Sequence, residues 1–313
     1  EIEAEKFFQY LFFRQWLALK NYARKKNVQI IGDIPIFVAL DSADVWCNRD
    51  KFKFDDKGSP LVVAGVPPDY FSKTGQLWGN PIYDWEAMRA DDFSWWTARI
   101  SFSLMTVDIV RLDHFIGFAR NWEVPSGDRT AENGKWVDVP GEALFTVLRR
   151  RLGDLAIIAE DLGAMTPEVD ELRDAFGFPG MRILQYGFGG DARNRDLPHN
   201  YIPNCVAYTG THDNETAAGW YKATGKNVRA HYRKYFGSSG RDVPLEMIRA
   251  CLASVANTAI VPFQDLIGLK NDARMNTPGT ASGNWEWRLA EDDLNDKLAK
   301  RLRDLAETYG RVR

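Results

Sequence analysis

The sequence is poor in cysteine and histidine, and it has no long apolar run. Its 313 residues include three cysteines and four histidines, and Cys47, Cys205 and Cys251 are scattered without a CxxC pair. An odd, scattered set of thiols argues against a disulfide framework and predicts reduced cysteines in a cytoplasmic protein. No apolar run reaches the roughly 18–20 residues that a membrane span needs, so we expect no membrane partner.

An excess of charge of one sign is also lacking. The 40 basic and 43 acidic residues are dispersed along the chain and give a formal net charge of −3. Such a balance provides no basic surface for nucleic acid or for an anionic membrane. Aromatic residues are the one excess, with 11 Trp, 11 Tyr and 18 Phe. Tryptophans in polar loops suit stacking against flat ligand faces such as sugar rings.

Six apolar, β-branched runs alternate with amphipathic stretches, which predicts parallel βα units. This pattern fits either a doubly wound sheet or a barrel that lacks two units at its start. We expect helices at 2–26 (packed on a sheet), 86–104, 141–152, 166–177, 215–223, 226–236, 244–256 and 291–309. Residues 39–96 predict a folded excursion over the site, and 121–141 and 274–287 predict polar loops. The six runs, each with the turn that ends it, are 28–38, 106–112, 156–163, 181–186, 205–216 and 259–265.

Acidic residues follow three of these strands. Arg111 and Asp113 are two residues apart and should face the same side of a strand. The arginine favours the charged form of the carboxylate, which makes Asp113 a candidate nucleophile. Glu160 ends an apolar strand beside Asp161, so we expect a raised pKa and a role as general acid. The alternative for each is a capping acid or a solvated ion pair.

The third of these acidic residues is Asp213, and the first strand also has an acidic residue at its end. Asp213, next to His212, could bind sugar hydroxyls and stabilise an oxocarbenium-like state, while Asp33 lies where the first strand gives way to a loop. His114 and His212 are read as hydroxyl-binding donors. Two carboxyl groups are the minimum for cleaving a glycosidic bond. A Mg²⁺ or Zn²⁺ site at the strand ends is a weaker alternative, because no H-x-H, H-E-x-x-H or paired-Asp motif occurs.

Several long motifs resemble the 4-α-glucanotransferases (amylomaltases) of glycoside hydrolase family 77, in the α-amylase clan. The resemblance covers essentially the whole chain and implies an α/β fold, a (β/α)8 TIM barrel. Residues 1–313 would form strands 3–8 only, with 39–96 as a lid inserted between strands 3 and 4. The motifs are IIGDIPIFVALDSADVW (30–46), GVPPDYFSKTGQLWGNPIYDW (65–85), DIVRLDHFIGF (108–118), NGKWVDVPG (133–141), IIAEDLG (157–163), YTGTHDNET (208–216) and RMNTPGTASGNWEWR (274–288).

The resemblance implies a role for each candidate residue. Asp113 would be the nucleophile, Glu160 the acid/base and Asp213 the transition-state stabiliser. Arg111 would hold Asp113 ionised, and the donor sugar would contact a further set of residues. That set comprises Asp33, His114 and His212, then Asp69, Tyr70, Phe71, Gln76 and Trp78 from the loop over the glucan groove, and Asn284 from the late GNW loop.

The implied reaction is a retaining transfer that needs no metal or organic cofactor. Donors would be maltodextrins or other α-1,4-glucans derived from starch or glycogen, and glucose would serve as an acceptor. Retention predicts catalytic carboxyl groups only ~5–5.5 Å apart. Two alternatives remain, an α-glucan hydrolase of the same clan and a non-catalytic glucan-binding fragment. Because a barrel without strands 1 and 2 would have two open edges, we also expect the isolated 313 residues to fold poorly or to be inactive.

Overall fold

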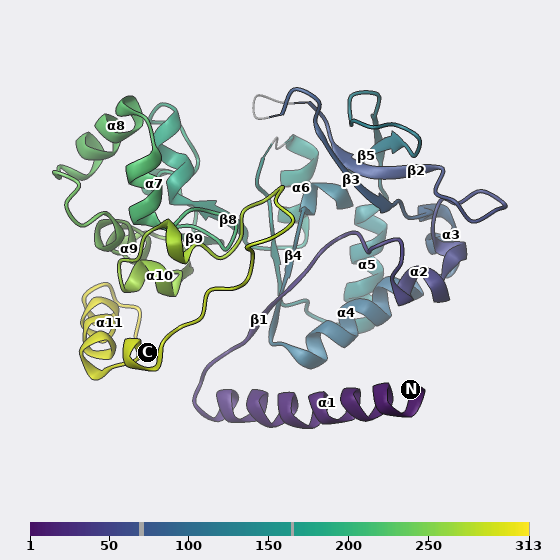
Figure 1. Cartoon of the computed structure of the whole chain (residues 1–313), viewed down its shortest axis with the longest axis horizontal. Helices are drawn as coiled ribbons and strands as arrows, with labels where there is room; N and C mark the ends of the chain where they lie inside the picture. Colours follow the sequence, from purple (N-terminus) through teal and green to yellow (C-terminus); the bar gives the residue numbers. More distant parts are fainter. Residues whose placement is uncertain (69–71, 164–165, 313) are drawn as a thin grey trace. The chain divides into compact units, whose positions relative to one another are not determined.

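The computed structural model describes residues 1–68, 72–163 and 166–312. They form two compact units, Glu1–Pro179 and Gly180–Arg313 (Figure 1). Each unit contains three parallel strands, so all six predicted strands are confirmed. The three cysteines are free, as predicted. In the described part of the chain, no helix combines the length and the apolar character that crossing a membrane requires.

The first unit holds a parallel and an antiparallel sheet with helices packed around them. Its helices are α1 (Ile2–Lys25), α2 (Ala43–Cys47), α3 (Trp85–Ala90), α4 (Ser94–Thr106), α5 (Gly141–Leu152) and α6 (Pro167–Ala175), with 3-10 turns at Arg49–Lys51 and Phe115–Phe118. Its strands are β1 (Ile31–Ile34), β2 (Val62–Val66), β3 (Gln76–Pro81), β4 (Ile109–Leu112), β5 (Arg120–Pro125), β6 (Lys135–Asp138) and β7 (Ile157–Ala159).

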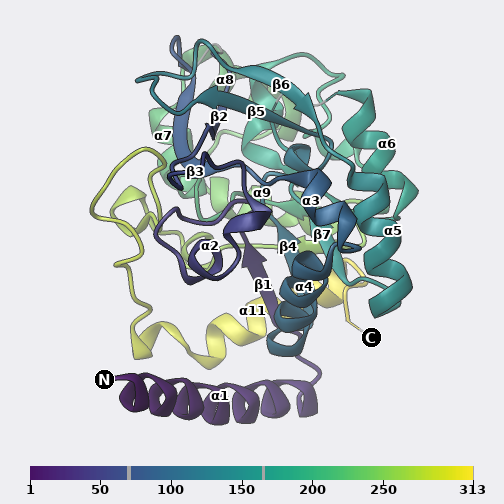
Figure 2. The ribbon, with the colours of Figure 1, turned by 90° about the vertical axis from the view of Figure 1, so that its right-hand side faces the viewer.

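The parallel strands β1, β4 and β7 form the sheet that positions the candidate site. β4 lies in the middle and pairs with both neighbours. Val110 and Leu112 of β4 are fully buried, and all three residues of β7 are buried, as expected for a sheet covered on both faces. Helix α4 packs against α5 and β4 (Figure 2).

The antiparallel sheet has the order β3-β2-β5-β6, and it corrects one expectation. The segment 121–141, expected as a polar loop, supplies β5 and β6. The excursion 39–96 supplies β2 and β3, and β2 pairs with β5. The loop prediction was wrong because β5 pairs with β2, which lies about sixty residues earlier in the chain, and a local sequence pattern does not show such pairing.

Two helix predictions also need correction. The helix expected at 86–104 is divided into α3 and α4, because Asp92 and Phe93 adopt left-handed backbone conformations with φ of 59° and 52°. Helix α1 is present, but it packs on α4 rather than on a sheet, and none of its residues is fully buried (Figures 1 and 2).

Aromatic side chains dominate the core of the first unit. The ring of Trp96, fully buried, contacts those of Tyr83, Trp95 and Phe118 with centroids 5.2–5.5 Å apart. Such edge-to-face pairs add about 0.5–1.5 kcal/mol each beyond the burial of their area. Much of the aromatic excess is therefore structural.

The second unit has three parallel strands, in which β9 lies in the middle and pairs with β8 on one side and β10 on the other. The strand expected at 181–186 ends at Ile183 and continues as a 3-10 turn, and the helix expected at 291–309 begins only at Asp296. The strands are β8 (Gly180–Ile183), β9 (Cys205–Tyr208) and β10 (Thr258–Ile260), and the helices are α7 (Ala217–Ala223), α8 (Lys226–Phe236), α9 (Val243–Ala253), α10 (Phe263–Leu266) and α11 (Asp296–Thr308), with 3-10 turns at Leu184–Gly189, Pro198–Asn200, Asn271–Ala273 and Glu291–Asp293.

Candidate active site

The register of the first unit brings four predicted site residues to one edge of the parallel sheet. Asp33 of β1 lies directly opposite Arg111 of β4. The last paired residues of β4 and β7 are followed immediately by Asp113 and Glu160. Because parallel strands end at the same edge, the carboxyl ends of β1, β4 and β7 place these side chains together, where α/β active sites form.

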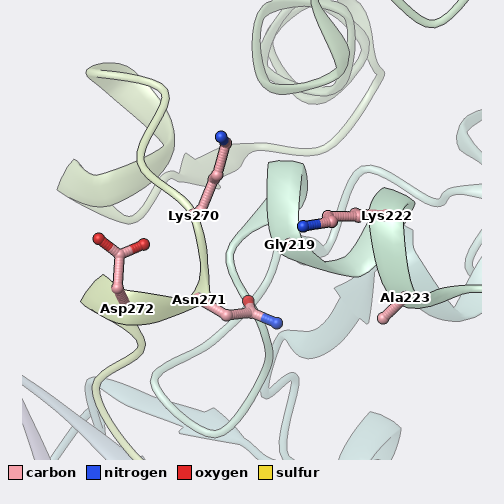
Figure 3. A pocket seen from close by; sticks show the side chains of 6 residues that line it. All are labelled: Gly219, Lys222, Ala223, Lys270, Asn271 and Asp272. Atoms are coloured by element: carbon pink, nitrogen blue, oxygen red, sulfur yellow. The ribbon is translucent and has the colours of Figure 1, made fainter.

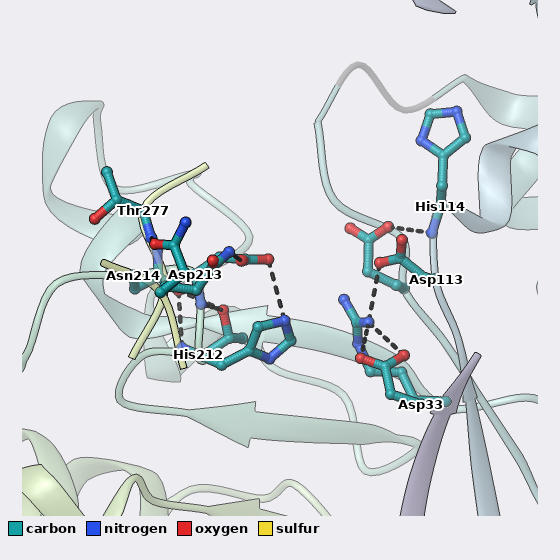
Figure 4. Close-up of polar contacts among 12 residues, drawn as sticks. Asp33, Asp113, His114, His212, Asp213, Asn214 and Thr277 are labelled. Atoms are coloured by element: carbon teal, nitrogen blue, oxygen red, sulfur yellow. Dashed lines mark hydrogen bonds and ion pairs between the residues drawn. The ribbon is translucent and has the colours of Figure 1, made fainter. Parts of the chain in front are cut away.

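Arg111 joins two of the carboxylates. Its Nη1 donates to both carboxylate oxygens of Asp33 at 2.7 Å and to Oδ1 of Asp113 at 2.9 Å (Figure 4). Burial alone would lower the pKa of Arg111, but the charges of Asp33 and Asp113 outweigh it and raise that pKa. The arginine is 8% exposed, whereas each carboxylate side chain is 43% exposed. The predicted Arg-x-Asp pairing is confirmed, and both carboxylates remain open to a ligand.

Glu160, unlike the exposed carboxylates of Asp33 and Asp113, is a buried carboxyl group with a raised pKa. Its carboxyl oxygens accept hydrogen bonds from the backbone N–H groups of His114 at 2.8 Å and Leu162 at 3.1 Å. Burial, and then the charge of Asp113, raise the pKa of Glu160 to about 8, against the lowering effect of Arg111 and the two amides. A carboxyl group with this pKa is protonated at neutral pH and can act as a general acid. The predicted direction is confirmed.

Asp161, the neighbour of Glu160 in that prediction, has an ion-pair partner of its own. Asp161 is buried and forms an ion pair with Arg173 of α6, which is itself 4% exposed. The neighbouring carboxylate therefore anchors the segment after β7 to α6.

His114 is held in a left-handed conformation, with φ 51° and ψ 54°. Few non-glycine residues adopt this region, and here it directs the backbone N–H toward Glu160. Burial lowers the pKa of His114 to about 4, so the imidazole is neutral at physiological pH. A neutral imidazole can donate from one nitrogen and accept at the other, as contact with sugar hydroxyls requires.

A small cavity opens beside these residues. Its volume is about 180 Å³, and the tryptophan ring of Trp78 lies 4.7 Å from that of His114 in an edge-to-face arrangement. Gln76 accepts a hydrogen bond from the indole N–H of Trp78 at 3.2 Å. Asp69, Tyr70 and Phe71, also predicted to bind substrate, lie outside the described residues. The cavity is lined by Pro35, Ile36, Phe37, Trp78, Asn80, Asp113 and His114.

Asp213 lies in the second unit, on the loop between β9 and α7, and residues of the segment 274–276 hold it. Asn276 donates from Nδ2 to Oδ1 of Asp213 at 2.6 Å, and Arg274 donates to its backbone carbonyl at 2.7 Å. His212 Nε2 is 3.3 Å from the other carboxylate oxygen (Figure 4), and its ring packs against Trp285. The side chain of Asp213 is 39% exposed, so it too can meet a ligand.

The segment 274–285 contains both a predicted residue and missed ones. Asn284 accepts a hydrogen bond from the backbone N–H of Thr277 and donates to Thr280, which stabilises the loop itself. Asn276, Arg274 and Trp285 contact the Asp213 loop but were not predicted. Their only sequence signal is a cluster of polar and aromatic residues in one late loop. No spacing rule relates this loop to the Asp213 loop, which lies about sixty residues earlier.

A larger cavity of about 410 Å³ lies between α7 and residues 270–272 in the second unit (Figure 3). It is lined by Lys222, Lys270 and Asp272 together with Gly219, Ala223 and Asn271. A single carboxylate cannot supply an acid and a nucleophile, so the pair of carboxyls in the first unit is the better catalytic candidate. Across residues 1–68, 72–163 and 166–312, no three His, Cys, Asp or Glu side chains are grouped as metal ligands would be.

Comparison of the sequence with known proteins gives one consistent result. The family model of 4-alpha-glucanotransferase matches residues 1–294. The 4-alpha-glucanotransferases of Synechocystis sp. and Clostridium butyricum are each 50% identical, over 99% and 98% of this chain and 62% and 63% of those proteins. The chloroplastic/amyloplastic relative from Arabidopsis thaliana is 48% identical over 97% of this chain and 54% of that protein. The chain thus spans less than two thirds of the length of these relatives.

Solved structures agree on the fold. The amylomaltase from Streptococcus agalactiae, in complex with acarbose, matches with a TM-score of 0.92 and 42% identity over 96% of this chain and 61% of that chain. The amylomaltase from Corynebacterium glutamicum matches with a TM-score of 0.76 at 19% identity over 95% of this chain and 48% of that chain, which bears on the fold alone. These matches confirm the predicted fold class, the α/β fold of the amylomaltases.

Proposed function

The chain belongs to the 4-alpha-glucanotransferase family, and on that premise we propose that it is a retaining transferase of the EC 2.4.1.25 type. It moves α-1,4-glucan segments from a maltodextrin donor to the 4-hydroxyl group of an acceptor sugar. The observation that carries the proposal is the pairing of an open carboxylate, Asp113, held by Arg111, with a protonated carboxyl group, Glu160. Two carboxyls with different proton affinities are what glycosidic bond cleavage requires.

In the first step, Asp113 attacks the anomeric carbon of the donor. A bond forms from its carboxylate oxygen to that carbon, and the bond to the glycosidic oxygen breaks. Glu160 gives its proton to the departing oxygen, which leaves as the free 4-hydroxyl group of the released glucan. Charge on Asp113 disappears when it becomes an ester, and that charge is one cause of the raised pKa of Glu160. The pKa of Glu160 therefore falls in the intermediate.

In the second step, Glu160 acts as a base. Its carboxylate takes the proton of the acceptor 4-hydroxyl group, whose oxygen attacks the anomeric carbon and displaces Asp113. Two inversions at the same carbon restore the α configuration. The net result is one glycosidic bond broken and one formed, with both carboxyl groups returned to their starting states.

Asp213 is proposed as the third catalytic carboxylate, which stabilises positive charge on the sugar ring. Asn276 and Arg274 support this role because they fix its side chain and backbone. Asp33, His114 and Trp78 are proposed to bind the donor sugar, since the cavity and the Arg111 network present them to it. The remaining predicted contacts, Asp69, Tyr70, Phe71, Gln76, His212 and Asn284, stay predictions.

Donors are proposed to be maltodextrins and α-1,4-glucans from starch or glycogen, with glucose as an acceptor. The match to an amylomaltase in complex with acarbose supports a glucan site. A cytoplasmic location also stays a prediction, because three plant relatives are described as chloroplastic/amyloplastic.

Incubation with maltotriose, followed by chromatography of the products, tests the proposed function. Transfer yields glucose and a ladder of longer maltodextrins, and the Asp113→Asn variant yields neither. Glucose and maltose without longer products would identify a hydrolase. Binding of maltodextrin without turnover, in a protein that unfolds cooperatively, would identify a glucan-binding protein.

A further inference from the structure

We propose that Asp265 is a positioning residue for the transfer reaction. Its buried carboxylate fastens both ends of the loop 210–216, which carries His212 and Asp213. The inference rests on the proposed function in one respect, namely that Asp213 takes part in transfer. Asp265 is 1% exposed and acts through this loop rather than on the sugar.

The two oxygens of the Asp265 carboxylate reach different ends of the loop. Oδ2 accepts the hydroxyl hydrogen bond of Thr209 at 2.6 Å, and Thr209 is the residue that follows β9. Oδ1 accepts the backbone N–H of Ala217 at 2.7 Å, and Ala217 is the first residue of α7. One side chain on α10 therefore fixes the exit from the strand and the entry to the helix.

Because all three groups are buried, none of them can exchange its hydrogen bond for one with water. Thr209 and Ala217 are each 0% exposed, so both donors and the carboxylate are removed from water. A buried carboxylate is costly unless hydrogen bonds satisfy it, and a buried donor left without a partner is destabilising as well. Burial raises the pKa of Asp265, and the bonds from Thr209 and Ala217 oppose that change. The three groups therefore stabilise one another only in this geometry.

The loop between the two anchors is braced by an internal bond and by a neighbouring turn. Asn214 Oδ1 accepts the backbone N–H and the hydroxyl of Thr211, and Gln185, in the 3-10 turn after β8, donates to the carbonyl of Glu215. Because these bonds link the loop residues to one another, we expect the loss of an end anchor to shift the part of the loop that carries Asp213. Displacement of a catalytic group by about 1 Å can cost roughly 100-fold in rate, so a small shift of Asp213 is enough to matter.

The test measures kcat and KM for maltotriose transfer in three variants. Asp265→Ala releases both ends, and we expect kcat to fall about 10- to 100-fold with little change in KM. Thr209→Val releases one end and should give a smaller loss in kcat. Asp265→Asn should recover most of the rate, because its amide oxygen still accepts from Ala217 and its NH₂ group faces the Thr209 hydroxyl oxygen.

A double-mutant cycle separates positioning from general stabilisation. In the Asp213→Asn background, Asp265→Ala should change the residual kcat by less than about 2-fold, because residues that act through one another are not additive. The same fold loss in both backgrounds, or a lower melting temperature with unchanged kcat, would overturn the inference. If Asp265→Ala does not fold, Thr209→Val answers the same question.

Hydrogen exchange decides the inference independently of activity. The amides of residues 210–217 should exchange faster in Thr209→Val than in the unsubstituted chain, while those of β8 and β9 stay unchanged. Equal exchange of the loop in both proteins would overturn the inference. An inactive chain with this exchange difference would contradict the proposed function and leave the anchoring role supported.

Discussion

At the residue scale, Glu160 and Asp113 differ in their surroundings more than in their chemistry. Arg111 contacts Asp113 directly, whereas Glu160 is bound by backbone amides and lies close enough to Asp113 to feel its charge. The Arg-x-Asp spacing and the apolar strand before Glu160 made these surroundings predictable. The roles of Asn276 and Arg274 were not, because their contacts with Asp213 join segments about sixty residues apart.

Transfer activity should fall as the pH rises through about 8. Glu160 must be protonated to donate to the leaving oxygen, and its pKa is about 8. The Glu160→Gln variant should lose about 10²–10⁴-fold in kcat with maltotriose and should show no such fall. A glycosyl fluoride donor, whose leaving group needs no proton, should restore the first step in this variant. A wild-type profile that stays flat to pH 10 would contradict the assignment.

Stability should depend on the same proton. The pKa of Glu160 is about 8 in the folded protein against an ordinary value of 4.5, so its contribution to folding is complete below pH 4.5 and is lost as the pH rises through 8. Between these values stability falls by up to about 1.4 kcal/mol per pH unit. Glu160→Gln should therefore raise the melting temperature relative to wild type more at pH 9 than at pH 5. An equal difference at both pH values would show that Glu160 is ionised in the folded protein.

Arg111→Lys should lower kcat although the positive charge is kept. The contacts to Asp33 and Asp113 come from one guanidinium nitrogen, Nη1, and the lysine side chain is one bond too short to bring its ammonium group to the same point. We expect a loss of about 100-fold, the size seen when a reacting group is misplaced by about 1 Å. Arg120→Lys, at a half-buried arginine that stacks on Trp136, is the matched control and should keep its activity. Equal kcat in Arg111→Lys and wild type would show that Arg111 does not position Asp113 for transfer.

At the scale of elements, strands with buried, β-branched sequences were predictable and their surroundings were not. β1, β4 and β7 were identified from their composition, and the polar residues at their ends followed from the parallel register. The antiparallel sheet was missed because β2 and β5 come from two segments that read as loops on their own. The break between α3 and α4 was missed because it depends on positive φ at Asp92 and Phe93.

Helix α1 offers a direct test of packing within one element. The indole N–H of Trp16 donates to the carbonyl of Thr106 at 2.7 Å, and the ring packs on the core, whereas Phe8 is 59% exposed. Trp16→Ala should lower the free energy of unfolding by about 1–3 kcal/mol. Phe8→Ala should change it by no more than about 0.5 kcal/mol. Denaturant unfolding of both variants measures the difference, and similar losses would show that α1 packs differently.

At the scale of the whole molecule, the proposed catalytic carboxylates are divided between the two units. Asp113 and Glu160 belong to Glu1–Pro179, and Asp213 belongs to Gly180–Arg313. The motifs that contain these three carboxylates were recognisable in the sequence because each follows a strong strand. The family assignment rests on the whole chain, and the relatives that it matches are longer.

The covalent glycosyl-aspartate is the central claim, and trapping it is the most direct measurement. Glu160→Gln, mixed with a glycosyl fluoride donor, should form the ester but release it slowly, because glutamine cannot take a proton from the acceptor. Mass spectrometry of the denatured, digested protein should find one added glycosyl group on the peptide that contains Asp113, and none in the Asp113→Asn/Glu160→Gln variant. A glycosyl group on another residue, or an unlabelled protein whose wild-type form performs transfer, would contradict the account.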